Sequence, residues 1–122
     1  MPSKPSPKDE LLKTATILED FGEWSKAARY YTKAREYLKA AKLYEHNGEF
    51  NKAGDSYYAA GKLTEAVKMY TRAGRKDKKM ANLYEKVGYF REAADIWKSL
   101  KCKRNWKRCT LRLREPTFFD LE

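Results

Sequence analysis

Small and aromatic side chains follow one another along this chain at the spacing of a single helix face. The clearest case, at positions i, i+1, i+4 and i+7, is Ala66, Val67, Tyr70 and Ala73. This spacing forms one stripe along an α-helix, and the alternation of a strand fits none of it. The aromatic position of successive stripes is filled by Tyr31, Tyr44, Tyr57, Tyr70, Tyr84 and Trp97. The pattern therefore predicts an all-α chain in which these aromatic side chains pack between helices.

Glycine residues separate the stripes at regular intervals. Gly48, Gly61, Gly74 and Gly88 stand 13, 13 and 14 residues apart. One continuous helix is unfavourable, because each internal Gly costs about 1 kcal/mol and such steps leave successive stripes about 140° out of phase. A Gly just after each stripe instead suits the left-handed residue that ends a helix. We expect seven units between residues 11 and 101, each with about nine or ten helical residues and a short turn. The N-caps expected from this division are Ser25, Asn51 and Thr64.

Helices of this length are marginal in water on their own, so each must be stabilised by stacking on its neighbours. Consecutive helices joined by short turns run antiparallel, and the result is an α-solenoid. We place this array at residues 8–101, after a disordered tail at residues 1–7. A basic segment at residues 102–114 follows, with an irregular capping helix near 103–114, and then an acidic-aromatic tail at 115–122.

Residues 61–73 carry the sequence GKLTEAVKMYTRA, which resembles the turn and second helix of a tetratricopeptide repeat. Residues 48–53 and 88–93 resemble it equally, and the likeness covers most of residues 11–101. Two units here span only 26 or 27 residues, whereas the usual repeat has about 34. The array is therefore more similar to the short-helix repeats of vesicle-coat, intraflagellar-transport and SNAP-like adaptor proteins. The resemblance implies a right-handed solenoid that acts as a protein-binding scaffold and has no catalytic residue.

The composition of the 122 residues narrows the chemistry further. One His and two Cys nearly exclude multi-ligand metal sites and His-based triads, so we expect no enzyme, metal or cofactor. The acids Glu19 and Asp20 are expected to decorate a helix surface. Cys102 and Cys109 do not resemble a secreted disulfide framework, which favours a reducing intracellular, cytoplasmic location. No apolar run approaches the ~18 residues of a membrane span, and no signal-peptide core is present.

Positive charge is concentrated in the second half of the chain. The net charge is +10, and residues 62–122 hold 17 basic and 8 acidic side chains. Trp106 lies within a run from residue 98 to 114 that has no acidic residue and these basic ones: Lys98, Lys101, Lys103, Arg104, Lys107, Arg108, Arg112 and Arg114. Such a mixture suits single-stranded nucleic acid, an anionic membrane surface or an acidic peptide. The alternative is a helix that caps the array, with Trp106, Cys109, Leu111 and Leu113 facing inward.

Two smaller sets of residues are further candidates for partner contact. One is a basic cluster around the 14-residue unit, which is otherwise a solvated turn: Arg72, Arg75, Lys76, Lys78 and Lys79. The other is Tyr30 and Tyr58, which lie beside stripe positions and face either a partner or solvent. Three alternatives stay open for Phe118 and Phe119 of the tail. They dock on the array's own end, they form a recognition motif for another chain, or the tail is the start of a segment in a longer protein.

The leading hypothesis from the sequence is a non-enzymatic adaptor that binds a peptide or helix through its helical faces. Nucleic-acid or anionic-surface binding through the basic C-terminal third is the second hypothesis. A structural segment of a larger assembly is the third, and self-association fits it because the array lacks clear polar caps.

Overall fold

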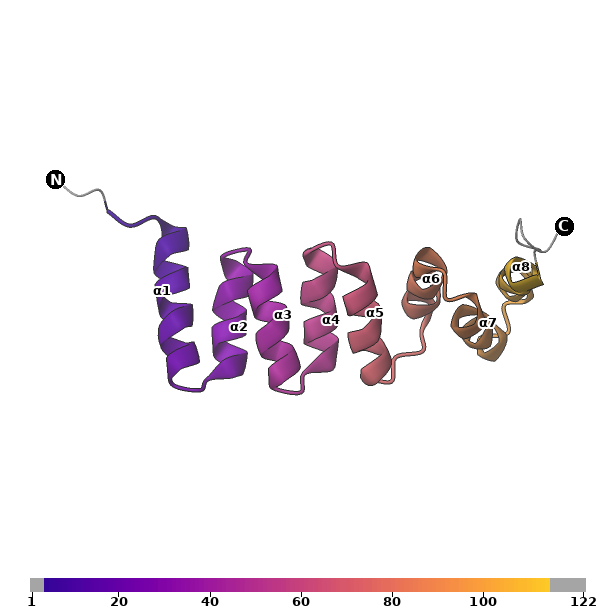
Figure 1. Cartoon of the computed structure of the whole chain (residues 1–122), viewed down its shortest axis with the longest axis horizontal. Helices are drawn as coiled ribbons and strands as arrows, with labels where there is room; N and C mark the ends of the chain where they lie inside the picture. The colour runs from indigo at the N-terminus through magenta and orange to yellow at the C-terminus, as the bar shows by residue number, and fades with distance from the viewer. Residues whose placement is uncertain (1–3, 115–122) are drawn as a thin grey trace, which may run out of the picture. The chain divides into compact units, whose positions relative to one another are not determined.

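The computed structural model describes residues 4–114, which form eight α-helices and no strand (Figure 1). The helices are α1 (Pro7–Asp20), α2 (Trp24–Lys33), α3 (Tyr37–His46), α4 (Phe50–Ala59), α5 (Leu63–Arg72), α6 (Lys78–Val87), α7 (Phe90–Ser99) and α8 (Lys103–Arg114). The predicted all-α class is confirmed. Helices α2 to α7 have 10 residues each, as the repeat spacing predicts.

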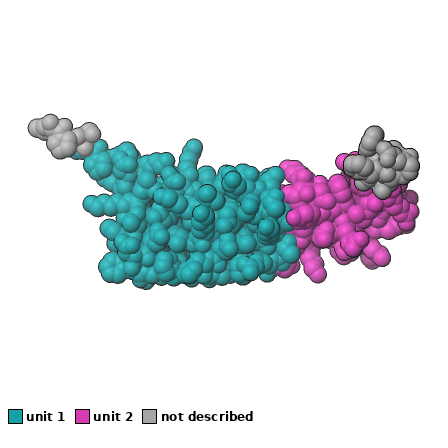
Figure 2. Space-filling view, in the orientation of Figure 1, with its two compact units in different colours: residues 1–73 teal, residues 74–122 magenta. Residues whose placement is uncertain are grey.

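The chain divides into two compact units, residues 1–73 and 74–122 (Figure 2). In the first unit each helix from α1 to α4 packs against the next one along the chain, and in the second unit α7 packs against both α6 and α8. The boundary lies between Ala73 and Gly74, where the single 14-residue interval begins. The sequence predicts one array over residues 8–101, and each of the two units is a helical stack of that kind.

Helix α1 begins at Pro7, inside the segment predicted to be a disordered tail at 1–7. The Ser6 side chain accepts a hydrogen bond from the Asp9 backbone N–H at 3.1 Å, and the Asp9 carboxylate accepts one from the Ser6 N–H. This reciprocal capping box, with Pro at the first helical position, fixes where α1 starts. Residues 1–3 and the predicted acidic-aromatic tail at 115–122 lie outside the described residues.

The helices end at residues in the left-handed conformation, as the Gly spacing predicts. Five of the seven turns place a Gly there, for example Gly48 with φ of 78°. Arg35 and Lys101 occupy the same step of the repeat with φ of 62° and 58°, although neither is Gly. After Gly48, the Glu49 N–H donates to the Tyr44 carbonyl oxygen at 2.9 Å, which satisfies an acceptor at the end of α3.

The predicted N-caps are wrong by two positions. In six of the seven turns only one residue separates the left-handed residue from the next helix, and α2 to α5 and α7 begin at the aromatic or Leu residue itself; three residues separate Gly74 from α6. Ser25, Asn51 and Thr64 therefore lie second in their helices. The residues that stand at these N-caps, without a side-chain hydrogen bond, are Glu23, Glu49 and Lys62. Asp77 does cap its helix, because its carboxylate accepts from the Met80 N–H at 2.9 Å.

The buried residues of both units are the small and aromatic residues of the stripes. The six stripe aromatics, from Tyr31 to Trp97, are at most 7% exposed, which confirms that they pack inside the fold. Pairs of alanines such as Ala40 and Ala41 are completely buried beside them. Small side chains let neighbouring helix backbones approach, and the aromatic rings fill the remaining space.

Several buried aromatic side chains donate to an acid on the preceding helix. The Tyr31 hydroxyl donates to Glu19 and the Tyr57 hydroxyl to Glu45, both at 2.8 Å. The sequence-based expectation for Glu19 is therefore wrong. This side chain is half-buried and serves as a partner for a tyrosine, because a buried hydroxyl needs a hydrogen-bond acceptor.

Candidate functional site

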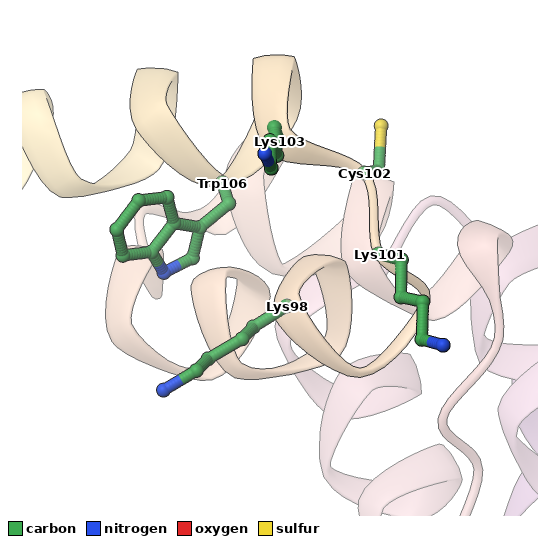
Figure 3. A pocket seen from close by; sticks show the side chains of 5 residues that line it. All are labelled: Lys98, Lys101, Cys102, Lys103 and Trp106. Atoms are coloured by element: carbon green, nitrogen blue, oxygen red, sulfur yellow. The ribbon is translucent and has the colours of Figure 1, made fainter.

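A groove lies where helix α7 ends and helix α8 begins. Its volume is about 340 Å3, and the residues that line it are Lys98, Lys101, Cys102, Lys103 and Trp106. Four of these five, all except Cys102, are among the binding residues predicted from the sequence. Figure 3 shows the Trp106 indole reaching from α8 toward α7, with the Lys98 side chain extending on the same side.

A tight turn brings these residues together. Lys101 adopts the left-handed conformation, and the Cys102 N–H then donates to the carbonyl oxygen of Trp97 at 2.9 Å. The Trp106 N–H donates in turn to the Cys102 carbonyl at 3.0 Å, which closes the first turn of α8. The lysine at the end of α7 and the indole on α8 are consequently held on either side of a three-residue connection.

The groove is cationic. Lys98, Lys101 and Lys103 are all exposed, and no ion pair within residues 4–114 involves any of them. Three like charges around a partly buried apolar wall produce a local positive potential that attracts anionic ligands. The indole of Trp106 is half-buried, so one part of the ring packs in the fold and another stays accessible.

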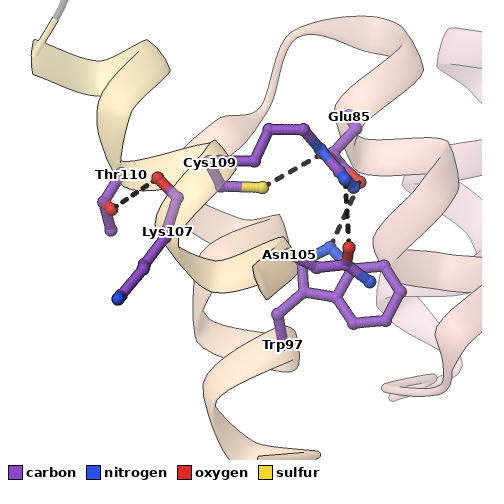
Figure 4. Close-up of polar contacts among 7 residues, drawn as sticks. Glu85, Trp97, Asn105, Lys107, Cys109 and Thr110 are labelled. Atoms are coloured by element: carbon purple, nitrogen blue, oxygen red, sulfur yellow. Dashed lines mark hydrogen bonds and ion pairs between the residues drawn. The ribbon is translucent and has the colours of Figure 1, made fainter. Parts of the chain in front are cut away.

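Glu85 on α6 holds helix α8 in place (Figure 4). Its carboxylate accepts two hydrogen bonds from the Arg108 guanidinium, at 2.9 and 3.0 Å. It also accepts from the Cys109 thiol and from the Trp97 indole N–H, both at 3.2 Å. Bidentate pairing of this kind fixes geometry as well as adding energy. One carboxylate therefore joins α6, α7 and α8 and sets the position of the groove's α8 wall.

The same contacts shift the ionisation of the groups involved. Burial alone raises the pKa of Glu85, but the hydrogen bonds from Arg108, Cys109 and Trp97 outweigh it, and the pKa is lowered. Burial, with the nearby Glu85 carboxylate, raises the pKa of Cys109 to about 11. The Cys109 thiol is therefore protonated at neutral pH and is a poor nucleophile. Within the described residues, no group of three or more His, Cys, Asp or Glu side chains is arranged to hold a metal.

The predicted capping role of α8 holds for part of the helix only. Cys109 is fully buried and Trp106 half-buried, as expected for inward positions. The prediction is wrong for Leu111 and Leu113, which are 62% and 48% exposed. Helix α8 is also a regular helix of 12 residues, whereas the sequence suggests an irregular one.

Not all of the predicted basic residues belong to the groove. Arg108 pairs with Glu85, and the Arg112 guanidinium lies over the Phe90 ring, 5.4 Å from its centroid, in a cation–π contact. Arg104, Lys107 and Arg114 are exposed on α8 outside the groove lining. The continuous basic run in the sequence is thus divided into residues that stabilise the fold and residues that face outward.

The second basic cluster is not confined to one unit. Arg72 belongs to the first unit, where its guanidinium lies 5.1 Å from the centre of the Phe50 ring. Arg75 belongs to the second unit and donates to Asp77 at 3.0 Å. The remaining members, all exposed and in the second unit, are Lys76, Lys78 and Lys79. A contact role for this cluster stays a prediction.

Tyr30 and Tyr58 lie apart from the buried stripe, as predicted. Tyr58 is 41% exposed. Tyr30 is half-buried, with the Lys33 ammonium 5.0 Å from its ring centre, and it lines a small cavity of about 180 Å3 on α2.

Near Phe50, a cavity of about 350 Å3 also contains charged residues, but Lys52 and Glu49 pair there at 3.2 Å. The α7–α8 groove differs because no ion pair among the described residues involves its three lysines.

Sequence reasoning missed Glu85. A usable signal is present, because Glu19, Glu45 and Glu85 each stand 12 residues before the stripe aromatic that donates to them. That interval is close to one repeat, so it connects equivalent faces of consecutive helices.

No family model matches the chain, and no curated protein or solved structure matches it. The resemblance to tetratricopeptide repeats therefore rests on the repeat residues and on the consecutive packing of short helices within each unit. No helix in residues 4–114 has the length and apolar character needed to cross a membrane.

Proposed function

We propose that this protein is a non-enzymatic, intracellular adaptor built as a right-handed, tetratricopeptide-like solenoid of antiparallel helices. The repeat motif and the packing of each helix on its sequence neighbour support this architecture. In six of the seven turns a single residue between the left-handed turn residue and the next helix leaves little room for any connection except a reversal of direction. Its role is to bind another protein through surfaces that the fold does not use for its own packing.

The observation that carries this proposal is the α7–α8 groove. Its lysines have no ion-pair partner among the described residues, and its Trp106 indole is only half-buried. Tryptophan is among the side chains that contribute most to protein interfaces, particularly in a preformed depression with a polar rim. The groove combines these features, with an indole wall and an ammonium rim.

Nucleic-acid or anionic-surface binding is the second candidate function. The three groove lysines favour it, together with the exposed Arg104, Lys107 and Arg114 on α8. Affinity for nucleic acid depends steeply on salt, because bound phosphates release their counterions. A titration of oligonucleotide binding against salt concentration therefore separates this function from protein binding.

The adaptor proposal is tested by affinity capture from nuclease-treated cell extract. The intact chain is compared with a variant that carries Lys98→Gln, Lys103→Gln and Trp106→Leu. We expect the intact chain to retain specific proteins after nuclease treatment and the variant to lose at least some of them. Retention of nothing but nucleic acid, or the loss of every captured protein on nuclease treatment, would overturn the proposal. A captured set that consists only of copies of this chain would favour the structural-segment alternative.

A further inference from the structure

We propose that the α7–α8 groove binds a short acidic peptide segment that presents one aromatic or large aliphatic side chain. This inference rests on the proposed protein-binding function and names the kind of partner. The apolar side chain of the ligand packs against Trp106 and Cys102, and its carboxylates lie near Lys98, Lys101 and Lys103. The five residues come from α7, the connecting turn and α8.

The size of the groove sets the size of what enters it. At about 340 Å3, it lies at the lower end of the ~300–1,000 Å3 range of ligand pockets. Its lining consists of an indole, a thiol and the aliphatic stems of lysines, so most of the wall is apolar. One bulky apolar side chain suits this space, with the flanking residues of the peptide over the charged rim.

The charge of the rim selects an acidic ligand. Residues 98–114 contain no acidic side chain, and the described contacts bring Glu85 to α8. Glu85 is already occupied by Arg108, Cys109 and Trp97. Among residues 4–114 the three rim lysines therefore have no ion-pair partner, and carboxylates are the complementary groups that a protein partner supplies.

The arrangement favours a peptide over a nucleic acid. Single-stranded nucleic acid is bound along a groove that follows the backbone and offers successive aromatic platforms. Here Arg108 is paired with Glu85 and Arg112 lies over Phe90, so the basic run does not form one continuous track. One half-buried indole, with no second aromatic residue in the groove lining, makes a compact site for a short ligand.

Lys101, which lines the groove, adopts a left-handed backbone conformation. Five of the seven equivalent turn positions are Gly, and a side chain in this left-handed conformation costs about 1 kcal/mol or more relative to Gly. In the groove that position is a lysine with φ of 58°. Arg35 has the same conformation in the first unit, with φ of 62°, so the pair Lys101→Gly and Arg35→Gly separates the effect of the turn from the effect of the groove charge.

The experiment uses the full chain and a fluorescein-labelled peptide of sequence Glu-Asp-Phe-Asp-Glu, followed by fluorescence anisotropy. A second peptide has Ser in place of Phe, and an oligothymidylate of similar length and charge serves as the nucleic-acid probe. Vesicles containing phosphatidylserine test an anionic membrane surface. We expect the Phe peptide to bind more tightly than the Ser peptide, the oligonucleotide and the vesicles.

Two variants locate the binding. The triple variant Lys98→Gln, Lys101→Gly and Lys103→Gln is expected to bind the Phe peptide with about tenfold lower affinity, because each exposed charge pair contributes up to about 1 kcal/mol. Trp106→Leu removes most of the preference for Phe over Ser. The matched control is Arg35→Gly, which removes one positive charge from the equivalent turn of the first unit and leaves binding unchanged.

Folding does not obscure the result. Lys101→Gly alone relieves the strained turn, so this variant is expected to be at least as stable as the natural chain while it binds the peptide more weakly. Equal binding by the Lys101→Gly and Arg35→Gly variants, or no preference for Phe over Ser, would overturn the inference. Tighter binding of the oligonucleotide or the vesicles would overturn it in favour of those ligands. If the peptide fails but nuclease-resistant protein capture persists, the inference fails and the adaptor function stands.

Discussion

Gly54 lies in helix α4 where this helix passes the ring of Tyr70 on helix α5. A Cβ atom built at Gly54 comes within 2.6 Å of Tyr70 Cε1 and 2.7 Å of Cδ1. Tyr70 is fully buried, and its hydroxyl donates to Asp55, so the ring has no free space to move into. The replacement Gly54→Ala therefore forces α4 and α5 apart or displaces the ring.

The expected magnitude is the balance of two terms. Ala in place of Gly favours a helix by about 1 kcal/mol, which at an open position would stabilise the protein. Forcing an extra methyl group into a filled core costs about 1–3 kcal/mol. The contact is about 0.8 Å short of the 3.4 Å at which ordinary contact begins, so the upper part of that range applies. We expect a net loss of about 1–2 kcal/mol in the free energy of unfolding.

Urea denaturation followed by far-ultraviolet circular dichroism measures this loss. The matched comparison is the same substitution in a Tyr70→Leu background, where the ring is absent and Gly54→Ala should be neutral or stabilising. Stabilisation by Gly54→Ala in the natural background would refute the close approach of α4 and α5. An identical loss in both backgrounds would show that Tyr70 is not the cause.

Three further predictions concern the packing, the turns and the acid at the centre of the second unit. Tyr57→Ala should cost about 3–5 kcal/mol as a buried aromatic truncation, measured by urea denaturation; a cost below about 1 kcal/mol would place this side chain at the surface. Arg35→Gly should stabilise the protein by up to about 1 kcal/mol because it relieves a left-handed residue, whereas Gly48→Ala should destabilise it through strain alone. A Cβ at Gly48 has no neighbour within 4 Å, so an unchanged melting temperature in both variants would contradict this explanation. Glu85→Gln should cost about 1–2 kcal/mol at neutral pH, a value reduced because Arg108 is half-exposed. The lowered pKa of Glu85 means that its contribution is complete above the unfolded value of about 4.5 and is lost as pH falls through the folded value. Stability measured against pH should accordingly show a shallower acid-side decline in the Glu85→Gln variant, and an identical decline in both proteins would exclude this role.

Much of the local structure followed from spacing alone. Helix length, the left-handed turn residues and the buried aromatic stripe depend on residues within about 13 positions of one another, and all of these are visible in the sequence. The cap positions failed because Ser25 and its equivalents are good N-cap residues by type. The short turns nevertheless leave that place to the residue two positions earlier.

The candidate groove was partly visible in the same way. Lys98, Lys101, Lys103 and Trp106 stood out as basic residues with an interleaved aromatic, but the sequence did not separate them from Arg108 and Arg112. That separation arises because Arg108 contacts Glu85, 23 positions earlier in the chain, and Arg112 contacts Phe90, 22 positions earlier.

The amino-acid sequence by itself determined that the chain forms short helices, where each ends, and which face of each is buried, because backbone preference and hydrophobic periodicity act over one repeat. Only the tertiary structure decided which charged side chains pair within the fold. It also decided that Leu111 and Leu113 stay exposed and that the Tyr70 ring packs directly against Gly54. Those outcomes depend on distances between helices, and the one-dimensional pattern does not contain such distances. The groove at α7 and α8 depends on both: the sequence supplies its residues, and the packing of residues 4–114 leaves its three lysines without an ion pair in that part of the chain.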